Sequence, residues 1–194
     1  KGDHEAARVK FDKAMKIYKN IGGRLGEATA CHNLATIDLE KGDYQAAQEK
    51  FKTSIEIKNE IGDRMGEAET WHQLATIDFR MGDYQAAREK YEDAIKIFQQ
   101  IGDPEGEAGA FHQLGFLSWN KCYTNEGLRL IALSHIITKS IGHEKAKLSL
   151  KNLSIMASQL CYDQESFDAM LKEVVESYAR DRGWSLIRSA FPES

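Results

Sequence analysis

The sequence predicts an all-α protein in which antiparallel helix pairs stack side by side into a solenoid. The first observation is a repeat, because residues 26–65 and 66–105 align without a gap and share 22 identities in 40 positions. A fixed period in this range is the sequence mark of a solenoid. The second observation is a Gly-Asp pair between successive helical segments, and the third is the helical spacing of apolar residues within those segments.

The Gly-Asp pairs mark where one helix ends and the next begins. Glycine adopts the left-handed conformation that closes a helix, and the aspartate side chain accepts hydrogen bonds from the free amides of the next one. Proline at a first helical position has no amide to leave unpaired, which suits Pro104 directly after Asp103. Such turns make successive helices antiparallel neighbours. The pairs are Gly42-Asp43, Gly62-Asp63, Gly82-Asp83 and Gly102-Asp103.

Within the unit 66–105 the first helix is expected to end near Arg80 and the second to run from Tyr84 to Gln100. Small residues on each helix allow the two to approach closely, and large residues beside them fill the remaining space. The apolar positions are Ala68, Trp71, Leu74, Ala75 and Ile77 on the first helix, then Ala87, Tyr91, Ala94, Ile95 and Phe98 on the second.

These residues resemble the tetratricopeptide repeat, whose pattern is matched by Trp71-x2-Leu74-Ala75 and then by Ala87-x3-Tyr91. The period of 40 is longer than the usual one, and it resembles the extended repeats of kinesin light chains and of many prokaryotic proteins. The resemblance implies a right-handed α-solenoid, the tetratricopeptide superhelix. Asp38 and Asp78 depart from it, because the family usually has an aromatic residue there.

The repeat predicts that the whole chain is one array. Lys1-Gly2-Asp3 aligns with Lys41-Gly42-Asp43, so the chain starts at a turn inside a unit. We expect it to be a fragment of a longer repeat protein, or its exposed first helix to pair with another copy. The expected parts are 1–25 as the second helix of a truncated unit, 26–65 and 66–105 as full units, 106–145 as a partly degenerate unit, 146–182 as a degenerate unit and 183–194 as a C-terminal capping helix.

Composition narrows the class of partner. The net charge is −4 and no basic stripe is present, which argues against nucleic acid as a partner. No apolar run reaches the length of a membrane span and no signal peptide is visible. The scattered cysteines Cys31, Cys122 and Cys161 are interpreted as reduced core thiols, and they predict a cytoplasmic protein.

The family resemblance implies a peptide-binding groove along the first helices of the stacked units. Equivalent residues then form columns, and the column of asparagine and glutamine is the best candidate for holding a peptide backbone, because an amide both donates and accepts hydrogen bonds. The candidate groove residues are His32, Asn33, Thr36, Glu69, His72, Gln73, Thr76, Phe79, Arg80, His112, Gln113, Phe116, Trp119 and Asn152.

Several of these residues have a second interpretation. The three histidines lie on successive first helices, and packed helices are about 8–10 Å apart, too far for a shared zinc ion with ligands at about 2.0–2.1 Å. They are interpreted as packing or groove-lining residues, or as a pH-sensitive ligand contact. Phe116 and Trp119 either anchor an apolar ligand group or form a floor for the C-terminal helices. Asp38 and Asp78 are expected to make structural hydrogen bonds or ion pairs with a lysine or arginine.

The predicted function is therefore a scaffold that binds a peptide or helix of a partner protein. No phosphate loop, catalytic triad or Cys-x-x-Cys motif is present, so we expect no enzyme activity, no cofactor and no metal. Two alternatives remain open. The chain is a regulatory or sensor arm of a larger signalling ATPase or protease, or it is a self-assembling structural repeat protein that associates through its first helix.

Overall fold

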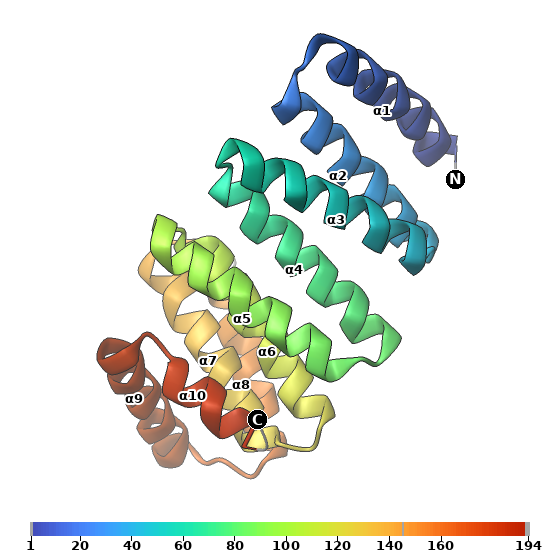
Figure 1. The fold of residues 1–194 in the computed structure, drawn as a ribbon. Helices are drawn as coiled ribbons and strands as arrows, with labels where there is room; N and C mark the ends of the chain where they lie inside the picture. The colour runs from blue at the N-terminus through green and yellow to red at the C-terminus, as the bar shows by residue number, and fades with distance from the viewer. Residues whose placement is uncertain (1, 145, 193–194) are drawn as a thin grey trace. The chain divides into compact units, whose positions relative to one another are not determined.

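The computed structural model describes residues 2–144 and 146–192, and within those ranges it contains ten α-helices and no strand. Lys1, where the predicted first part begins, lies outside the described residues. The all-α prediction is confirmed. The helices are α1 (Gly2–Ile21), α2 (Arg24–Lys41), α3 (Tyr44–Ile61), α4 (Arg64–Met81), α5 (Tyr84–Ile101), α6 (Pro104–Asn120), α7 (Thr124–Ser140), α8 (Ala146–Gln159), α9 (Gln164–Asp181) and α10 (Trp184–Ala190) (Figure 1).

The turns form as the Gly-Asp pairs predict. Gly42 closes α2 with a φ of 80°, and the Asp43 side chain accepts a hydrogen bond from the Ala46 amide at 3.2 Å at the start of α3. The turn between α6 and α7 has no such glycine, and Cys122 takes the left-handed conformation there with a φ of 69°. A residue with a Cβ is strained in that conformation, so this turn is held by the helices around it.

The chain divides into two compact units, Lys1–Ile97 and Phe98–Ser194, which are described separately. In the first unit, helices α1 to α4 lie side by side in chain order (Figure 1). The helices approach closely because the alanines at their crossings are fully buried, as the sequence predicts. Large apolar residues fill the space around those crossings. The core consists of Ala35, Leu39, Ala47, Phe51, Ile55, Leu74 and Ile77, with Tyr44 and Trp71 packed against it.

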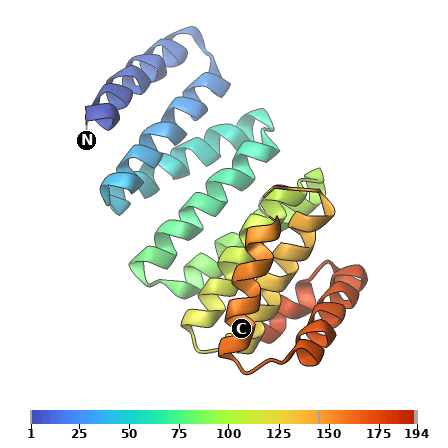
Figure 2. The same ribbon diagram turned by 180° about the vertical axis from the view of Figure 1, so that it is seen from behind.

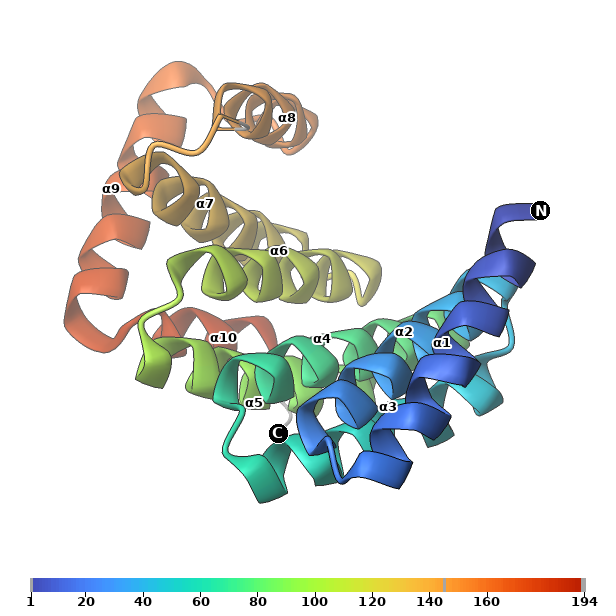
Figure 3. The ribbon, with the colours of Figure 1, turned by 90° about the horizontal axis from the view of Figure 1, so that it is seen from above.

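In the second unit, the backbones of α6 and α7 approach closely at two glycines. A Cβ on Gly127 would lie 2.7 Å from the Gly115 carbonyl oxygen. The two backbones therefore touch at positions where the earlier 40-residue repeats have alanines. Both α8 and α9 pack on α7 (Figure 2). Helix α9 runs crosswise to α7, and α10 returns to contact α6, α7 and α9 (Figure 3). The last helices therefore fold back on the unit.

A buried carboxylate fixes these C-terminal helices. Glu107 is 1% exposed and accepts hydrogen bonds from Gln99 Nε2 at 2.8 Å, the Tyr178 hydroxyl at 3.0 Å and Arg182 Nη2 at 2.8 Å. Burial and the nearby Glu107 charge raise the pKa of Tyr178 to about 12, so its hydroxyl remains a donor. Pro104, three residues before Glu107 on the same helix, carries no charge. The positive charge that pairs with Glu107 therefore comes from Arg182.

The expectation that all three cysteines are core thiols is wrong for two of them. Cys31 is buried, but Cys122 and Cys161 are exposed because each lies in a turn after the helix has ended. On α9, Val175 is 47% exposed and Ser177 is buried. All three cysteines are free. Among the described helices, none is both long enough and apolar enough to cross a membrane.

Candidate functional site

The predicted groove residues of the first unit lie on α2 and α4. These helices point their Leu-Ala pairs into the core, which leaves the neighbouring histidines and amides half-buried at the surface. A hydrogen bond of 3.0 Å between His32 Nδ1 and Thr70 Oγ1 joins the two helices directly. The structure thus brings together His32, Asn33 and Thr36 on α2 with Glu69, His72, Gln73, Thr76, Phe79 and Arg80 on α4.

The remaining predicted residues lie in the second unit. Helix α6 carries His112, Gln113, Phe116 and Trp119, and α8 carries Asn152, which is exposed. Phe116 is 37% exposed, so the C-terminal helices do not cover it. Trp119 is half-buried, and its backbone lies against Gly127 of α7.

Two of the histidines predicted to line the groove contact aromatic rings of the following helix. The His32 ring meets Phe51 edge-on at 5.0 Å between centroids, and the His72 ring meets Tyr91 in the same way at 5.3 Å. Burial lowers the pKa of both histidines to about 4, and for His32 the nearby Lys58 charge adds to the effect. Both rings are therefore neutral at pH 7.

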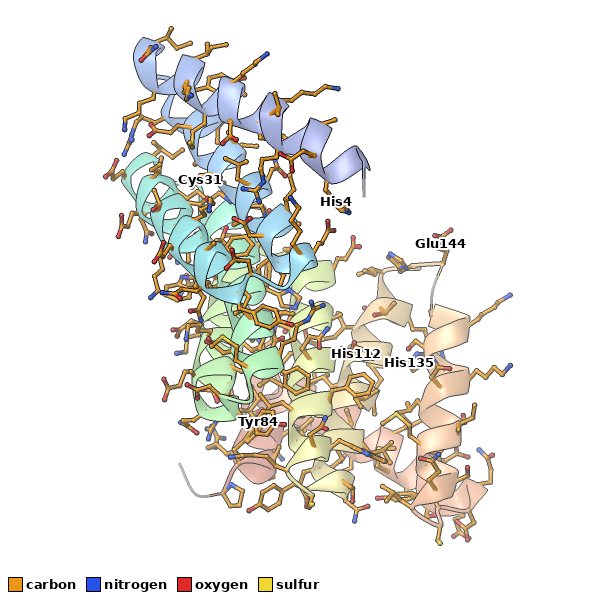
Figure 4. All side chains as sticks on the ribbon, turned by 90° about the vertical axis from the view of Figure 1, so that its right-hand side faces the viewer. His4, Cys31, Tyr84, His112, His135 and Glu144 are labelled. Atoms are coloured by element: carbon orange, nitrogen blue, oxygen red, sulfur yellow. The ribbon has the colours of Figure 1, made fainter. Side chains whose placement is uncertain are left out.

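His112 makes a similar contact within its own helix. Its ring meets Phe116 at 4.8 Å, and burial lowers its pKa below the ordinary value. Figure 4 labels this residue together with His135, which lies on α7. Among the described residues, no group of three or more His, Cys, Asp or Glu side chains is arranged to hold a metal ion.

The amide side chains differ from the hydroxyls beside them. Asn33, Gln73 and Gln113 are half-buried, and their amides have no hydrogen-bond partner among the residues that the structure describes. The Thr36 hydroxyl donates to the His32 carbonyl at 3.1 Å, and the Thr76 hydroxyl is 3.0 Å from that of Tyr91. The threonines therefore serve the fold, whereas the amides keep their hydrogen-bonding capacity.

The other predicted residues of the first unit are at its periphery. Phe79 is half-buried, with its ring 5.7 Å from that of Tyr84. Glu69 and Arg80 are exposed. The two carry opposite charges on one helix, so the surface of α4 has no single sign of charge.

Asp38 makes the ion pairs expected of it. It is 3% exposed, and it is bound by Arg8 of α1 and by Lys50 of α3 at 2.7 Å. Burial opposes its ionisation, but the hydrogen bonds from Lys50 and Arg8 hold the pKa of Asp38 below its usual value. The aspartate thus replaces an aromatic packing residue with a charged link across three helices.

Asp78, 40 residues later, repeats this arrangement. It is 4% exposed and accepts a hydrogen bond from Gln48 Nε2 at 2.8 Å, while Lys90 Nζ lies 2.5 Å from its other oxygen. The expectation of structural ion pairs is confirmed for both aspartates.

Lys58 is a buried polar residue that the sequence reasoning missed. It is 4% exposed and donates to the Gly66 carbonyl at 3.0 Å and to Thr70 Oγ1 at 2.9 Å. Burial lowers the pKa of this lysine. A signal was present, because Lys58 stands in a column whose members 40 residues away are Tyr18 and Phe98. A lysine in an aromatic column indicates a buried ammonium with its own acceptors.

Two stretches of the chain match models of a known repeat family. Tetratricopeptide repeat models match residues 1–60 and residues 68–101. Residues 1–60 and 68–101 are tetratricopeptide repeats.

Solved structures support the same fold for the chain. BtubC (BKLC) from P. vanneervenii is 17% identical with a TM-score of 0.69, and the match covers 100% of this chain and 76% of that one. A putative kinesin light chain with nearly identical tetratricopeptide-like repeats from Podosopora anserina is 16% identical with a TM-score of 0.58, covering 93% and 96%. A second crystal structure of that protein, of a point variant, is 18% identical with a TM-score of 0.58, covering 92% and 94%.

At these identities the likeness shows the fold alone, and it confirms the predicted α-solenoid class. No curated protein matches this chain in sequence.

Proposed function

We propose that the first-helix surface of this chain binds an extended segment of a partner protein. Tetratricopeptide repeats mediate protein–protein interaction or scaffolding, and the family is typically non-enzymatic. The observation that carries the proposal is the set of half-buried amides without partners, Asn33 and Gln73 in the first unit and Gln113 in the second. These amides are only half-buried, so a ligand can reach them, and a peptide backbone offers donors and acceptors that match both ends of an amide.

The surrounding side chains suit a backbone ligand. His72 is neutral at pH 7 because burial lowers its pKa to about 4, so it adds a neutral donor and acceptor next to Gln73 and no charge. Glu69 and Arg80 are exposed with opposite signs at the two ends of this strip. The strip therefore favours backbone recognition over recognition of a strongly charged segment.

Replacing His72 and Gln73 together with alanine is expected to abolish capture of the partner in a pull-down. The His72 ring contacts Tyr91, but Gln73 has no partner within the described residues, so most of the fold remains. The helical circular dichroism signal should be unchanged. The matched control is Gln85→Ala with Glu89→Ala, an exposed pair on α5 joined by a hydrogen bond of 2.9 Å. Equal capture by the His72/Gln73 variant and the wild type would refute the assignment.

We also propose self-association through α1 as a second role. A cavity of about 500 Å³ between α1 and α2 is lined by Phe11, Tyr18 and Leu25 among others. Beside it Ile17 is 58% exposed and Ile21 is 70% exposed. An exposed apolar strip of this kind is typical of a protein interface.

The mass measured by light scattering is then expected to rise with protein concentration. Ile17→Lys with Ile21→Lys should hold it at the value of one chain, because both side chains are exposed and their replacement leaves the core intact. Val175→Lys on α9, which replaces an apolar side chain that is 47% exposed, is the control. A constant mass in the wild type would remove this role and leave the groove proposal unaffected.

We place the site of action in the cytoplasm. The support is that all three cysteines are free thiols, two of them exposed, since oxidising compartments favour disulfides.

A further inference from the structure

A cavity of about 330 Å³ lies in the second unit between α6, α7 and α8. Helix α6 contributes Glu105, Gly109 and His112, helix α7 contributes Ser134 and Thr138, and helix α8 contributes Ser149. Figure 4 labels His112 and His135, which lie on α6 and α7. Because His112 belongs to the proposed groove, the cavity opens beside the residues that would hold a partner.

The cavity exists because Thr138 is short. The residues 40 and 80 positions earlier are Phe98 and Lys58, and both are long. The Phe98 ring lies so close to Gly106 that a Cβ there would be 2.4 Å from its Cε1 atom. Thr138 instead donates its hydroxyl back to the Ser134 carbonyl at 2.7 Å. The space that the Phe98 ring fills in one 40-residue repeat is therefore left open in the following repeat.

The walls hold polar groups without partners. Ser134 is 8% exposed and lines the cavity, and its hydroxyl has no hydrogen-bond partner among the described residues. The His112 imidazole also has no hydrogen-bond partner among the described residues. Burial lowers its pKa, so it is neutral at pH 7. Ser149 is positioned by its hydrogen bond of 2.9 Å to His135 Nδ1. A hydroxyl and a neutral imidazole call for an uncharged ligand group that can donate and accept.

The charges around the cavity argue against a charged occupant. Lys58, the ammonium in the equivalent place of the first unit, is stabilised by Asp63 and Glu69. The residues 80 positions after those two are His143 and Ser149, which carry no negative charge. The one carboxylate of the lining, Glu105, is 75% exposed and lies 3.4 Å from His143 Nε2, so it stands in solvent at the mouth rather than inside the cavity. No lysine or arginine lines the cavity to receive an anion.

We propose that this cavity takes the phenol ring of a tyrosine side chain from the bound partner. The ring of Phe98 shows that this place in a unit accommodates an aromatic ring, and Ser134 with His112 adds partners that a phenol can use and a phenyl ring cannot. Tyrosine combines an apolar body with a polar tip, a combination that is enriched at protein interfaces. The inference rests on the proposed function, and it names the side chain that the partner inserts.

The test is a nuclear magnetic resonance titration of the full chain, labelled with ¹⁵N, at pH 7.5 with four small probes. p-Cresol represents the tyrosine side chain, toluene the phenylalanine side chain and n-butylamine the lysine side chain, and N-acetyltyrosinamide adds a peptide backbone. p-Cresol and N-acetyltyrosinamide are expected to shift the amides of Gly109, Ser134 and Ser149 in a saturable way. Toluene should bind about three- to tenfold more weakly, because a net hydrogen bond is worth that factor, and n-butylamine should not saturate.

Two variants locate the site. Ser134→Ala removes a hydroxyl that has no partner in the described chain, so the fold should be intact while p-cresol binding falls to the level of toluene. Thr138→Met is expected to fill the cavity and abolish the shifts from all probes. Methionine is chosen because its side chain is flexible: the Phe98 ring packs against Gly106, whereas the equivalent residue 40 positions later is Ala146, which leaves less room for a rigid ring. Thr53→Met is the matched control, since Thr53 makes the same backbone bond, at 3.1 Å to Glu49, on an exposed face.

Each contrary outcome is decisive. Equal binding of toluene and p-cresol, or unchanged p-cresol binding by Thr138→Met, overturns the phenol assignment. Binding of p-cresol without N-acetyltyrosinamide overturns the tyrosine source in favour of a free small phenol. These probes do not involve His72 or Gln73, so a failure here leaves the groove proposal standing, and a failed pull-down leaves the cavity result standing.

Discussion

Lowering the pH from 7 to 4 is expected to reduce the free energy of unfolding by up to about 3 kcal/mol for each of His32 and His72. In the folded chain burial lowers the pKa of both from 6.5 to about 4. The unfolded chain therefore binds protons first as the pH falls. The stability from the neutral rings is fully present above pH 6.5 and is lost progressively as the pH falls toward 4.

Urea unfolding monitored by circular dichroism at pH 7.5, 6, 5 and 4 measures this loss. The variant His32→Gln with His72→Gln should show a flatter dependence on pH, because neither glutamine binds a proton in this range. His4→Gln is the control, since the side chain of His4 is 43% exposed and lies at the surface. If the double variant lost stability as steeply as the wild type between pH 6.5 and 4, the two buried rings would not be the acid-sensitive groups.

Asp78→Ala is expected to destabilise the chain by about 2–4 kcal/mol, because removing one member of a buried ion pair leaves the other charge without compensation. The carboxylate is 4% exposed and holds both Gln48 and Lys90. The upper end of the range is reduced because the Lys90 side chain is 24% exposed and can reach water in part. Chemical denaturation of the variant against the wild type measures the difference.

A double variant separates the lost pair from the lost packing. Replacing both partners, Asp78→Leu with Lys90→Met, is expected to recover much of the stability, since paired polar groups replaced by apolar ones of similar shape can be nearly neutral. The control is Asp93→Ala, which breaks the exposed pair of Asp93 with Lys96 at 2.9 Å, and exposed pairs are worth about 0–1 kcal/mol. A loss for Asp78→Ala no greater than for Asp93→Ala would show that the buried charge is not a structural link.

Most of the fold followed from local rules. Gly42 and Asp43 end and begin helices because glycine tolerates a positive φ and aspartate caps free amides, and neither property needs distant partners. The buried alanines at the crossings and the ion pairs of Asp38 and Asp78 recur with the repeat, so one unit explains the next. The C-terminal part departs from this regularity, because α9 and α10 pack on α7 through contacts that no period encodes.

The candidate site was predicted in part. The sequence placed His32 and His72 on equivalent helices, but it did not reveal that each ring contacts an aromatic ring of the following helix, or that burial keeps each imidazole neutral. The sequence also did not distinguish the role of the amides from that of the threonines. Only the structure separates Thr76, whose hydroxyl is bound to Tyr91, from Gln73, whose amide has no partner among the described residues.

The sequence by itself determined the helix pairs, their boundaries and the equivalence of positions 40 residues apart, because capping and helical periodicity act over a few neighbouring residues. The tertiary structure alone decided which polar groups are satisfied and where space remains. Lys58 finds acceptors on a neighbouring helix, whereas Thr138 leaves a cavity whose walls come from three helices. Such features depend on the lengths of side chains that meet across helices, and that meeting exists only once the chain has folded.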